Sequence, residues 1–471
     1  MAQHTEQTQT LTRALGRFDV LAVAFGAMIG FGWIVLTGDF LQSAGTLGAA
    51  LAFVIGGVVI LLVALTYAEL VAAMPHVGGE HNYVLRAMGS WPAFVTSWTL
   101  VLGYVSVVAF EAVALPQTLL YLVPDMLVGR LWTVAGYEVY ASWVAVGVVA
   151  AIVMTALNYV GVRPAAVFQS VAVAFLFIVG LVLLTGAFVG GSVEQMQPLF
   201  SGGAAGVITV LVATPFLFVG FDVIPQSAEE INLEFREIGR VLLVSVVIAI
   251  GWYVMIMVTV GSALPVDVLA ASELAAADGM AALWGSPLMG TLLVLGGIAG
   301  ILTSWNGFLI GASRLVYAMA RSGMLPRWFA RLHPTYRTPA NAILFIGALS
   351  MVAPFFGRRM LVWLVDAGGL AIIVAWLMVA LSFVVLRRRE PDMKRPFRTP
   401  GGVPVGVLAV LLSASLAFLF MPGQAAALVW PFEWAIVGLW TILGVFFLVR
   451  VARIGPGPDA EHQLMQAMHR S

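Results

Sequence analysis

The chain has 471 residues, of which 61% are hydrophobic and only 10% are charged, and its formal net charge is zero. Soluble domains usually carry about 25% charged residues, so a chain this apolar is predicted to be an integral membrane protein. It contains no cysteine, which excludes disulfides and thiolate metal sites. No signal peptide is expected, because the first 17 residues are polar and lack an apolar core.

Twelve apolar runs follow one another along the chain, and each is about long enough to cross a bilayer as a helix. They cover residues 18–43, 46–74, 91–123, 141–160, 164–190, 204–227, 239–263, 288–321, 339–356, 360–386, 402–421 and 429–450. The short tail after Arg453 is polar and is expected to be disordered.

The basic residues favour one orientation of these runs. If the N-terminus is cytoplasmic, all of the 23 Lys and Arg residues except Arg130, Arg358 and Arg359 fall in segments on the cytoplasmic side. Such an excess is the usual bias of cytoplasmic loops. An odd number of spans would destroy it, so a multi-pass protein of the cell membrane with both termini cytoplasmic is predicted.

Two of the runs contain residues that interrupt a helix. The first holds Gly26, Gly30 and Gly32 within seven residues, and glycine costs roughly 1 kcal/mol in a helix interior. The sixth holds Phe218-Val219-Gly220-Phe221-Asp222, followed by Pro225. Broken helix at membrane depth is tolerated only where protein buries it or where it lines a cavity. Paired breaks in two halves of a chain are typical of a transporter's substrate site.

Further motifs occur in the loops on the predicted cytoplasmic side. They are Pro75-His76-Val77-Gly78-Gly79-Glu80-His81-Asn82-Tyr83, Glu229-Glu230, Arg321-Ser322-Gly323-Met324-Leu325-Pro326, His333-Pro334-Thr335-Tyr336-Arg337-Thr338-Pro339 and Arg388-Arg389-Glu390-Pro391 with Arg395-Pro396-Phe397-Arg398-Thr399-Pro400-Gly401. With the two broken spans, they resemble the amino acid–polyamine–organocation (APC) superfamily of transporters, over about residues 18–450.

The resemblance implies an all-α membrane protein that works by alternating access. Two inverted repeats of five helices would form a transport core over 18–386, with helices 1 and 6 broken. A cytoplasmic tail (1–17), a basic loop (387–401), two peripheral helices (402–450) and a C-terminal tail (451–471) would complete the chain.

The implied function is secondary active transport of amino acids; an amine, polyamine or amino acid/amine exchanger is the alternative. An intramembrane enzyme is not expected, because no His or Cys lies within the spans. A channel is disfavoured, because the breaks are isolated and the charges gather at one side.

The first break is predicted to bind a substrate carboxylate. Backbone N–H groups from Ile29 to Gly32, including those of Gly30 and Phe31, suit an anion without a basic side chain. Carbonyl groups freed near Ala27 and Gly30, or the carboxyl group of Asp222, would accept from a substrate ammonium.

Aromatic residues are predicted to close over the substrate. Phe216, Phe218 and Phe221 surround the second break, which also includes Gly220. By resemblance to an exchanger of the superfamily, Phe216 is a gate and Trp305 is a second gate. The alternative is that these rings belong to the core, since Phe and Trp abound in this chain.

Five acidic residues fall within the apolar runs, where charges usually face a cavity. Glu69 and Asp366 are expected to be structural, and Asp222 is the best ammonium-binding or coupling residue. Glu111 is predicted either to recognise a cationic substrate or to hydrogen-bond a neighbour in a vestibule. For Asp39 three roles stay open: to bind a substrate ammonium, to carry a proton or to face a water-filled vestibule. Arg314 is the nearest basic residue within a span.

The coupling ion stays open between H⁺ and Na⁺. The fifth span has Phe175-Leu176 where several superfamily members place a lysine, so a lysine-based mechanism is not expected. Thr303 and Ser304 resemble the hydroxyl pair of a sodium site, although such hydroxyls also bond to their own helix. Asp222 or Glu111 would carry a proton instead. No cofactor or nucleic-acid partner is expected, only the substrate, the coupling ion and the bilayer; the oligomeric state stays open.

Overall fold

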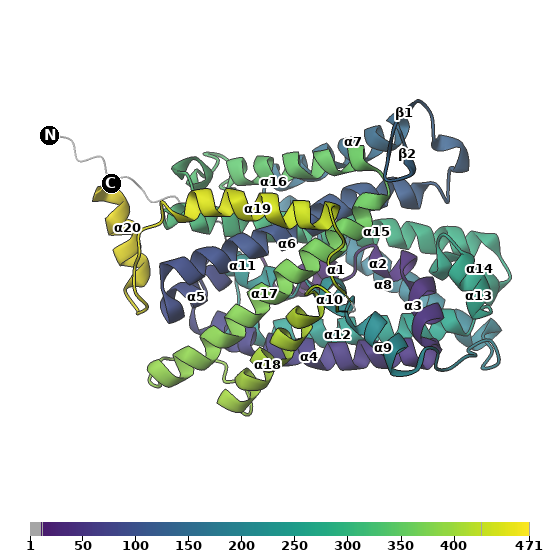
Figure 1. Ribbon diagram of the computed structural model, residues 1–471, viewed down its shortest axis with the longest axis horizontal. Coiled ribbons are helices and arrows are strands. Elements are labelled where there is room, and N and C mark those ends of the chain that lie inside the picture. The colour runs from purple at the N-terminus through teal and green to yellow at the C-terminus, as the bar shows by residue number, and fades with distance from the viewer. Residues whose placement is uncertain (1–10, 12, 425, 471) are drawn as a thin grey trace.

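The computed structural model describes residues 11, 13–424 and 426–470, and it is a bundle of long helices (Figure 1). The helices of the first half are α1 (Arg17–Met28), α2 (Gly32–Val35), α3 (Thr37–Ala44), α4 (Thr46–Ala73), α5 (Glu80–Met88), α6 (Ser90–Leu119), α7 (Ala141–Val160), α8 (Val162–Gly190), α9 (Gly203–Leu211), α10 (Thr214–Phe218), α11 (Val223–Gln226) and α12 (Phe235–Gly261). Those of the second half are α13 (Val266–Ala271), α14 (Ala275–Trp284), α15 (Pro287–Arg321), α16 (Ala340–Val352), α17 (Arg359–Arg389), α18 (Val403–Leu419), α19 (Phe432–Leu448) and α20 (Ala460–Arg470). Short 3₁₀ turns are η1 (Pro124–Met126), η2 (Ala228–Glu230), η3 (Arg327–Ala330) and η4 (Ala353–Phe356).

Eight helical segments of the described chain are long and apolar enough to cross a membrane. One of them, Gly203–Gln226, is built from the consecutive helices α9, α10 and α11. Three further apolar helices are shorter than this: α16 together with η4, α18, and α19. The first predicted run falls on α1, α2 and α3, which together are an interrupted helix. The predicted multi-pass membrane protein is therefore confirmed in its general form.

The structure departs from the predicted all-α chain in a loop and in the tail. After η1, strands β1 (Arg130–Val134) and β2 (Tyr137–Tyr140) pair as an antiparallel hairpin, joined by the two-residue turn Ala135–Gly136, in which both residues have positive φ. The tail expected to be disordered contains α20, which buries Ala460 and Leu464 and packs against α5. The basic loop is also shorter than predicted, because α17 runs on to Arg389.

The hairpin and α20 lie at opposite ends of the molecule (Figure 1). The end with β1 and β2 is called the hairpin end below, and the end with α5 and α20 is called the tail end. Both breaks lie between these two ends.

The two breaks pack against each other. α1 ends at Met28 and helix resumes at Gly32, while Val219 is extended (ψ 142°) and Gly220 has φ +133°. A Cβ on Gly220 would lie only 2.8 Å from the backbone nitrogen of Met28, so glycine allows this close approach. Each interruption thus places backbone groups beside the other.

Buried ion pairs connect the helices near the tail end. Arg314 of α15 forms two hydrogen bonds with Glu230, of 2.8 and 2.9 Å, so its partner is an acid of the loop motif rather than of a span. Glu69 of α4 is paired with Arg387 at 2.5 Å and with Arg395 at 3.0 Å. These pairs agree with a structural role for Glu69.

Candidate substrate site

A small cavity of about 20 Å³ lies where the two breaks meet. This volume is close to that of a single water position, roughly 10–15 Å³ on the same kind of measure, so a free amino acid needs a wider space. The lining residues come from α1, α2, α6, α10, α12, α15 and the first break: Ala27, Met28, Gly30, Phe31, Gly32, Val107, Phe110, Glu111, Phe216, Leu217, Tyr253, Ser304 and Phe308.

Glu111 lies directly against the first break. Its buried carboxyl group is beside the backbone N–H of Phe31 and the hydroxyl of Ser304, and its second oxygen has no hydrogen-bond partner among the described residues. Gly30 makes room for this contact: a Cβ there would overlap the Glu111 carboxylate and lie 2.9 Å from the Ser304 Oγ. The Phe31 N–H group, which is predicted to bind a substrate carboxylate, therefore faces the Glu111 carboxyl group in this structure.

Tyr253 of α12 ties the two breaks together. Its hydroxyl lies 2.9 Å from the carbonyl oxygen of Met28 and 3.1 Å from that of Leu217, and donates to these carbonyls. Tyr253 is not among the residues predicted from the sequence. A hydroxyl within an apolar span was the available signal, since a buried tyrosine usually needs a polar partner.

Four phenylalanine rings lie around the cavity, and three of them, Phe31, Phe110 and Phe216, pack against one another. The Phe216 and Phe110 centroids are 5.5 Å apart, those of Phe110 and Phe31 are 5.8 Å apart, and both pairs are T-shaped. Phe216 is only 8% exposed. The Phe31 and Phe110 rings also line a larger space at the hairpin end, so they lie between that space and the cavity.

The sequence profile of a family described as amino acid permease matches residues 15–446, nearly the whole chain. The chain belongs to the amino acid permease family. It is thus a transporter of amino acids across the membrane and not an enzyme, as the resemblance to the APC superfamily implied.

Known transporters resemble the permease along most of its length. The branched-chain amino acid permease BcaP of Bacillus subtilis (strain 168) is 28% identical over 92% of this chain and 93% of its own. The methylthioribose transporter of the same organism is 26% identical over 94% of each chain. Its aspartate–proton symporter is 26% identical over 86% of this chain and 79% of its own.

Part of the predicted substrate set lies together in the permease. Ala27, Gly30, Phe31, Gly32, Glu111 and Phe216 all line the cavity. The other predicted residues do not line it: Ile29, Phe218, Gly220, Phe221, Asp222 and Trp305.

The residues outside the cavity are engaged in packing or in shaping the breaks. Phe218 packs edge-on against Tyr253 at 5.2 Å, and Trp305 is fully buried. Asp222 accepts hydrogen bonds from the Gly220 N–H at 2.9 Å and from the Trp376 indole N–H at 3.3 Å. Its carboxyl group thereby holds the turn at the second break.

The predicted sodium ligands, Thr303 and Ser304, belong to α15, and Thr303 contacts α1. The Thr303 hydroxyl is 3.2 Å from the Gly26 carbonyl and 3.0 Å from that of Gly300, so it donates within the protein. The Gln169 amide donates to the Ala22 and Thr303 carbonyls at 3.2 and 3.1 Å. These interhelical hydrogen bonds join the first, fifth and eighth predicted spans, and the fifth span contributes the amide of Gln169 to them.

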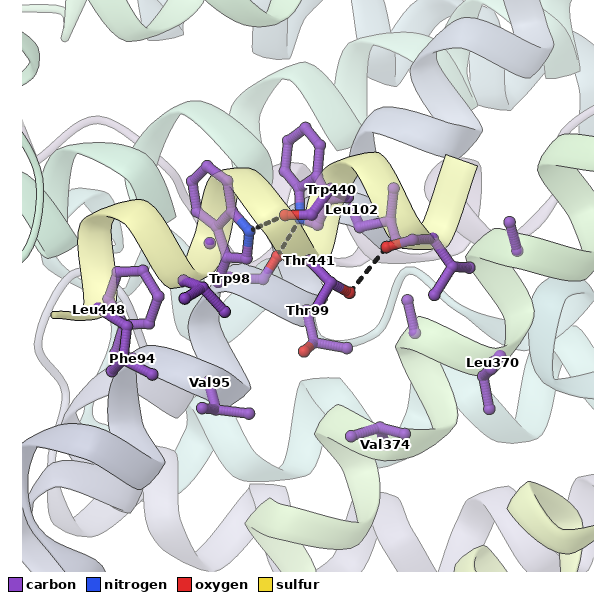
Figure 2. Close-up of a pocket in the computed structure, with 15 residues that line it drawn as sticks. Phe94, Val95, Trp98, Thr99, Leu102, Leu370, Val374, Trp440, Thr441 and Leu448 are labelled. Atoms are coloured by element: carbon purple, nitrogen blue, oxygen red, sulfur yellow. Dashed lines mark hydrogen bonds between the residues drawn. The ribbon is translucent and has the colours of Figure 1, made fainter. Parts of the chain in front are cut away.

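Another cavity, of about 240 Å³, lies away from the breaks, between α6, α17 and α19. Figure 2 shows Trp98 and Trp440 above it, where each indole N–H donates to the other residue's carbonyl, at 2.9 and 2.8 Å. The lining is almost entirely apolar apart from Thr99 and Thr441. It contains no group that would bind the charged ends of an amino acid.

Proposed function

We propose that the permease carries neutral amino acids with apolar side chains, by alternating access. The observation that carries this proposal is the composition of the cavity: N–H groups of the first break meet aromatic and aliphatic side chains there, with Glu111 as the single charged residue. No basic side chain lines it, so an acidic substrate side chain would have no partner. The likeness to a branched-chain amino acid permease supports this substrate class.

In this proposal the substrate carboxylate binds the N–H groups at Phe31 and Gly32, and carbonyl groups freed at the breaks accept from its ammonium. The present cavity is too small for an amino acid, so binding requires the Phe216, Phe110 and Phe31 rings to move apart. A ring that must open and close in each cycle is a gate. In this proposal the chain crosses the membrane twelve times and its core contains two inverted repeats. One repeat would move against the other as a rigid body, so that the site opens to one side of the membrane at a time.

The proposed orientation has the hairpin end outside the cell. Arg130, Arg358 and Arg359, the basic residues that did not fit a cytoplasmic position, are near the hairpin: Arg130 lies in β1 and Arg359 stacks on Tyr137. The basic segment that begins at Arg387 would then face the cytoplasm, with both termini.

For coupling, we propose a proton on Glu111. An ionised Glu111 and a substrate carboxylate at the same N–H groups repel each other, and protonation removes that repulsion. Sodium at Thr303 and Ser304 is the alternative, which the hydrogen bonds of Thr303 make less favourable because a cation would have to replace them.

Purified permease in proteoliposomes tests both proposals. Counterflow of labelled leucine is expected to be stimulated by internal leucine, isoleucine or valine, and not by the corresponding decarboxylated amines. Stimulation by the amines instead would support the amine exchanger. Uptake at pH 6 and pH 8, in sodium and in choline buffer, then identifies the ion.

An inward proton gradient is expected to drive uptake in choline as well as in sodium, and Glu111→Gln is expected to abolish the effect of the gradient. Uptake that needs sodium, and loses this need in Thr303→Ala, would reject the proton on Glu111.

A further inference from the structure

A second group of buried polar side chains lies between the second break and the tail end. Its members come from α4, α5, α6 and the second break: Tyr67, Glu80, Tyr83, Tyr104, Asp222 and Gln226. All six are fully buried, and none of them lines the cavity at the two breaks. These six residues are called the inner cluster below. Buried polar groups are costly unless they are paired, so a cluster of this size requires an explanation.

Glu80 belongs to the inner cluster and is only partly hydrogen-bonded. One of its carboxyl oxygens accepts a hydrogen bond from the Gln226 side-chain amide. Its other oxygen has no hydrogen-bond partner in the part of the chain that the structure describes. The groups that face Glu80 are the hydroxyls of Tyr67, Tyr83 and Tyr104 and the carboxyl group of Asp222. The surroundings of Glu80 thus contain a second acid and no cation among the described residues.

The arginines near this end of the molecule are paired with other acids. Arg314 of α15 is bound to Glu230, and Arg86 of α5 lies 2.5 Å from Glu390. Neither is free to neutralise Glu80. Burial and the neighbouring carboxyl group raise the pKa of Glu80 well above its ordinary value, which favours the neutral, protonated form.

Glu80 lies where the start of α5 contacts α11, the short helix that follows the second break. Gly79 has φ +31°, and a Cβ there would lie only 2.5 Å from the Cβ of Pro225. The Gly78 N–H donates to the backbone carbonyl of Gln226 at 3.3 Å. This close contact keeps water away from the carboxyl group. A movement of α11 away from α5 would therefore expose Glu80 to water.

Tyr104 connects the inner cluster to the candidate site. Its ring centroid lies 5.3 Å from that of Phe308, which lines the small cavity. Its hydroxyl lies beside the side chains of Asp222 and Gln226 but has no hydrogen bond of good geometry within the described chain. Buried hydroxyls of this kind are usually satisfied by ordered water. The inner cluster thus begins one aromatic ring away from the candidate site.

We propose that Glu80 is a proton-binding residue of the transport cycle, which releases its proton to water at the tail end. This inference rests on the proposed function for its coupling ion, and adds the group through which the proton leaves. While α5 and α11 are in contact, the Glu80 carboxyl group is neutral. When they separate, its O–H bond breaks, the proton passes to water and a hydrated carboxylate remains.

The cycle closes through the candidate site. A proton from the Glu111 carboxyl group passes through water in the inner cluster to the Glu80 carboxylate, which leaves Glu111 ionised and Glu80 neutral again. Each cycle then moves one proton from the site to the tail end. Separation of α5 and α11 both opens the tail end and releases the proton, so the two events are coupled.

Two transport assays in proteoliposomes test this role. Glu80→Gln keeps a neutral polar group but has no proton to release. Counterflow of leucine needs no net movement of protons, so its rate is expected to stay close to that of the unchanged permease. Accumulation of leucine driven by an inward proton gradient is expected to be lost. Glu80→Asp, which still titrates, is expected to retain most of it.

Two outcomes of these assays would overturn the proposal. Equal losses of counterflow and of gradient-driven accumulation in Glu80→Gln would assign Glu80 to structure. Gradient-driven accumulation that is unchanged in Glu80→Gln would show that the proton leaves by another group.

Infrared spectroscopy of the purified permease in lipid measures the protonation itself. The C=O band of protonated carboxyl groups at neutral pH is expected to lose intensity in Glu80→Gln. Glu229→Gln is the matched control, because Glu229 belongs to the same end, is partly exposed and lies 3.6 Å from Arg321, so it is expected to be ionised. A band that is equally strong in Glu80→Gln and in the unchanged permease would overturn the proposal.

Tyr67→Phe provides a second variant if Glu80→Gln does not fold. It removes a hydroxyl beside the Glu80 carboxyl group and leaves the ring in place. The C=O band is expected to shift in frequency, because this frequency depends on the hydrogen bonds of the carboxyl group. An unshifted band would mean that Glu80 is not the protonated group.

Failure of this proposal and failure of the proposed function give different results. A proton gradient that drives uptake in Glu80→Gln but not in Glu111→Gln would reject the role of Glu80 and keep the proton on Glu111. Uptake by the unchanged permease that requires sodium and ignores the proton gradient would reject the proposed coupling, and the release of a proton by Glu80 with it.

Discussion

Gly30 is the position where one added carbon would reach the groups that form the candidate site. Its missing Cβ leaves room for the Glu111 carboxyl group and the Ser304 hydroxyl, both of which are ends of side chains. We therefore expect Gly30→Ala to insert and fold normally, because these ends can shift, and to lose most leucine uptake. The measurement is initial uptake in proteoliposomes, normalised to the amount of folded protein in size-exclusion chromatography.

Alanine substitutions at two other glycines distinguish a loss of substrate binding from a general packing defect. Gly251 of α12 has open space where a Cβ would be, so Gly251→Ala is expected to transport normally. At Gly220 the Cβ would meet backbone atoms of Ala27 and Met28, and the residue has φ +133°, so Gly220→Ala is expected to reduce the folded yield. Normal uptake by Gly30→Ala would mean that the first break does not bind the substrate.

The sequence predicted the breaks better than the side chains that surround them. Glycine has a direct backbone effect, so Gly30 and Gly220 could be recognised from local composition alone. Phe110 has no such signal, because it is one of several aromatic residues in its apolar span, and Tyr253 had only the weaker signal of a hydroxyl within such a span. Only the folded structure shows that both line the cavity. Phe218 and Asp222 were predicted to lie at the site because they flank Gly220 in the sequence. In the structure the Phe218 ring packs against Tyr253, and the Asp222 carboxyl group accepts a hydrogen bond from Trp376.

At the scale of elements, the pair Arg314–Glu230 fastens the loop after the second break to α15. Both side chains are 1% exposed and share two hydrogen bonds. Arg314→Met would leave a buried carboxylate without a partner, which typically costs about 3–5 kcal/mol. We expect a clear fall of the unfolding temperature in detergent, and recovery of most of it in the double variant Arg314→Met/Glu230→Leu.

The exposed pair Arg240–Glu237 of α12 is the matched control. Its side chains are 47% and 24% exposed, so Arg240→Met is expected to cost less than about 1 kcal/mol. If Arg314→Met and Arg240→Met lowered the unfolding temperature equally, the buried pair would not fasten the loop.

Helix α5 contains a histidine that makes stability depend on pH. His81 is buried, with its Nδ1 3.3 Å from the Ser97 hydroxyl, and burial lowers its pKa to about 4. An unfolded histidine has a pKa of about 6.5, so the unfolded chain takes up a proton first as the pH falls. The stability that neutral His81 provides is present above pH 6.5 and is lost between about pH 6.5 and pH 4.

The expected loss between pH 7.5 and pH 5 is about 2 kcal/mol from this residue. Unfolding temperatures measured at both pH values are expected to differ less for His81→Gln, which keeps a polar group in place without the titration. An unchanged difference in the variant would assign the pH dependence to other residues.

Long apolar elements were predictable because their length and composition are sufficient to define them. The first run ends at residue 43 by sequence and α3 ends at Ala44, and the eighth begins at 288 where α15 begins at Pro287. The hairpin and α20 were missed because neither is defined by its own residues. β1 and β2 are five and four residues long, and Trp132 of the hairpin is held by the Phe355 carbonyl at 2.9 Å; α20 depends on its contact with α5.

At the scale of the whole molecule, the orientation of the ends gives the most direct test of the predicted spans. The hairpin and α20 are separated by an odd number of predicted crossings, so they are expected on opposite sides of the membrane. The chain has no cysteine, so a single introduced cysteine is the only thiol in the permease, and label on the purified permease reports that position alone. Val128, beside the hairpin and 66% exposed, and Gln463, exposed on α20, are suitable positions.

In intact cells a membrane-impermeant maleimide is expected to label Val128→Cys and not Gln463→Cys. Permeabilised cells are expected to give label on both, and the cysteine-free parent on neither. This pattern would follow from the distribution of basic residues, because arginines and lysines are retained on the cytoplasmic side during insertion. Label on both variants in intact cells would require an even number of crossings between them. That outcome would mean that at least one predicted span after the hairpin does not cross the membrane, with the shorter helices α16, α18 and α19 as the first candidates. It would reject the cytoplasmic position of the C-terminus and leave the hairpin end outside the cell.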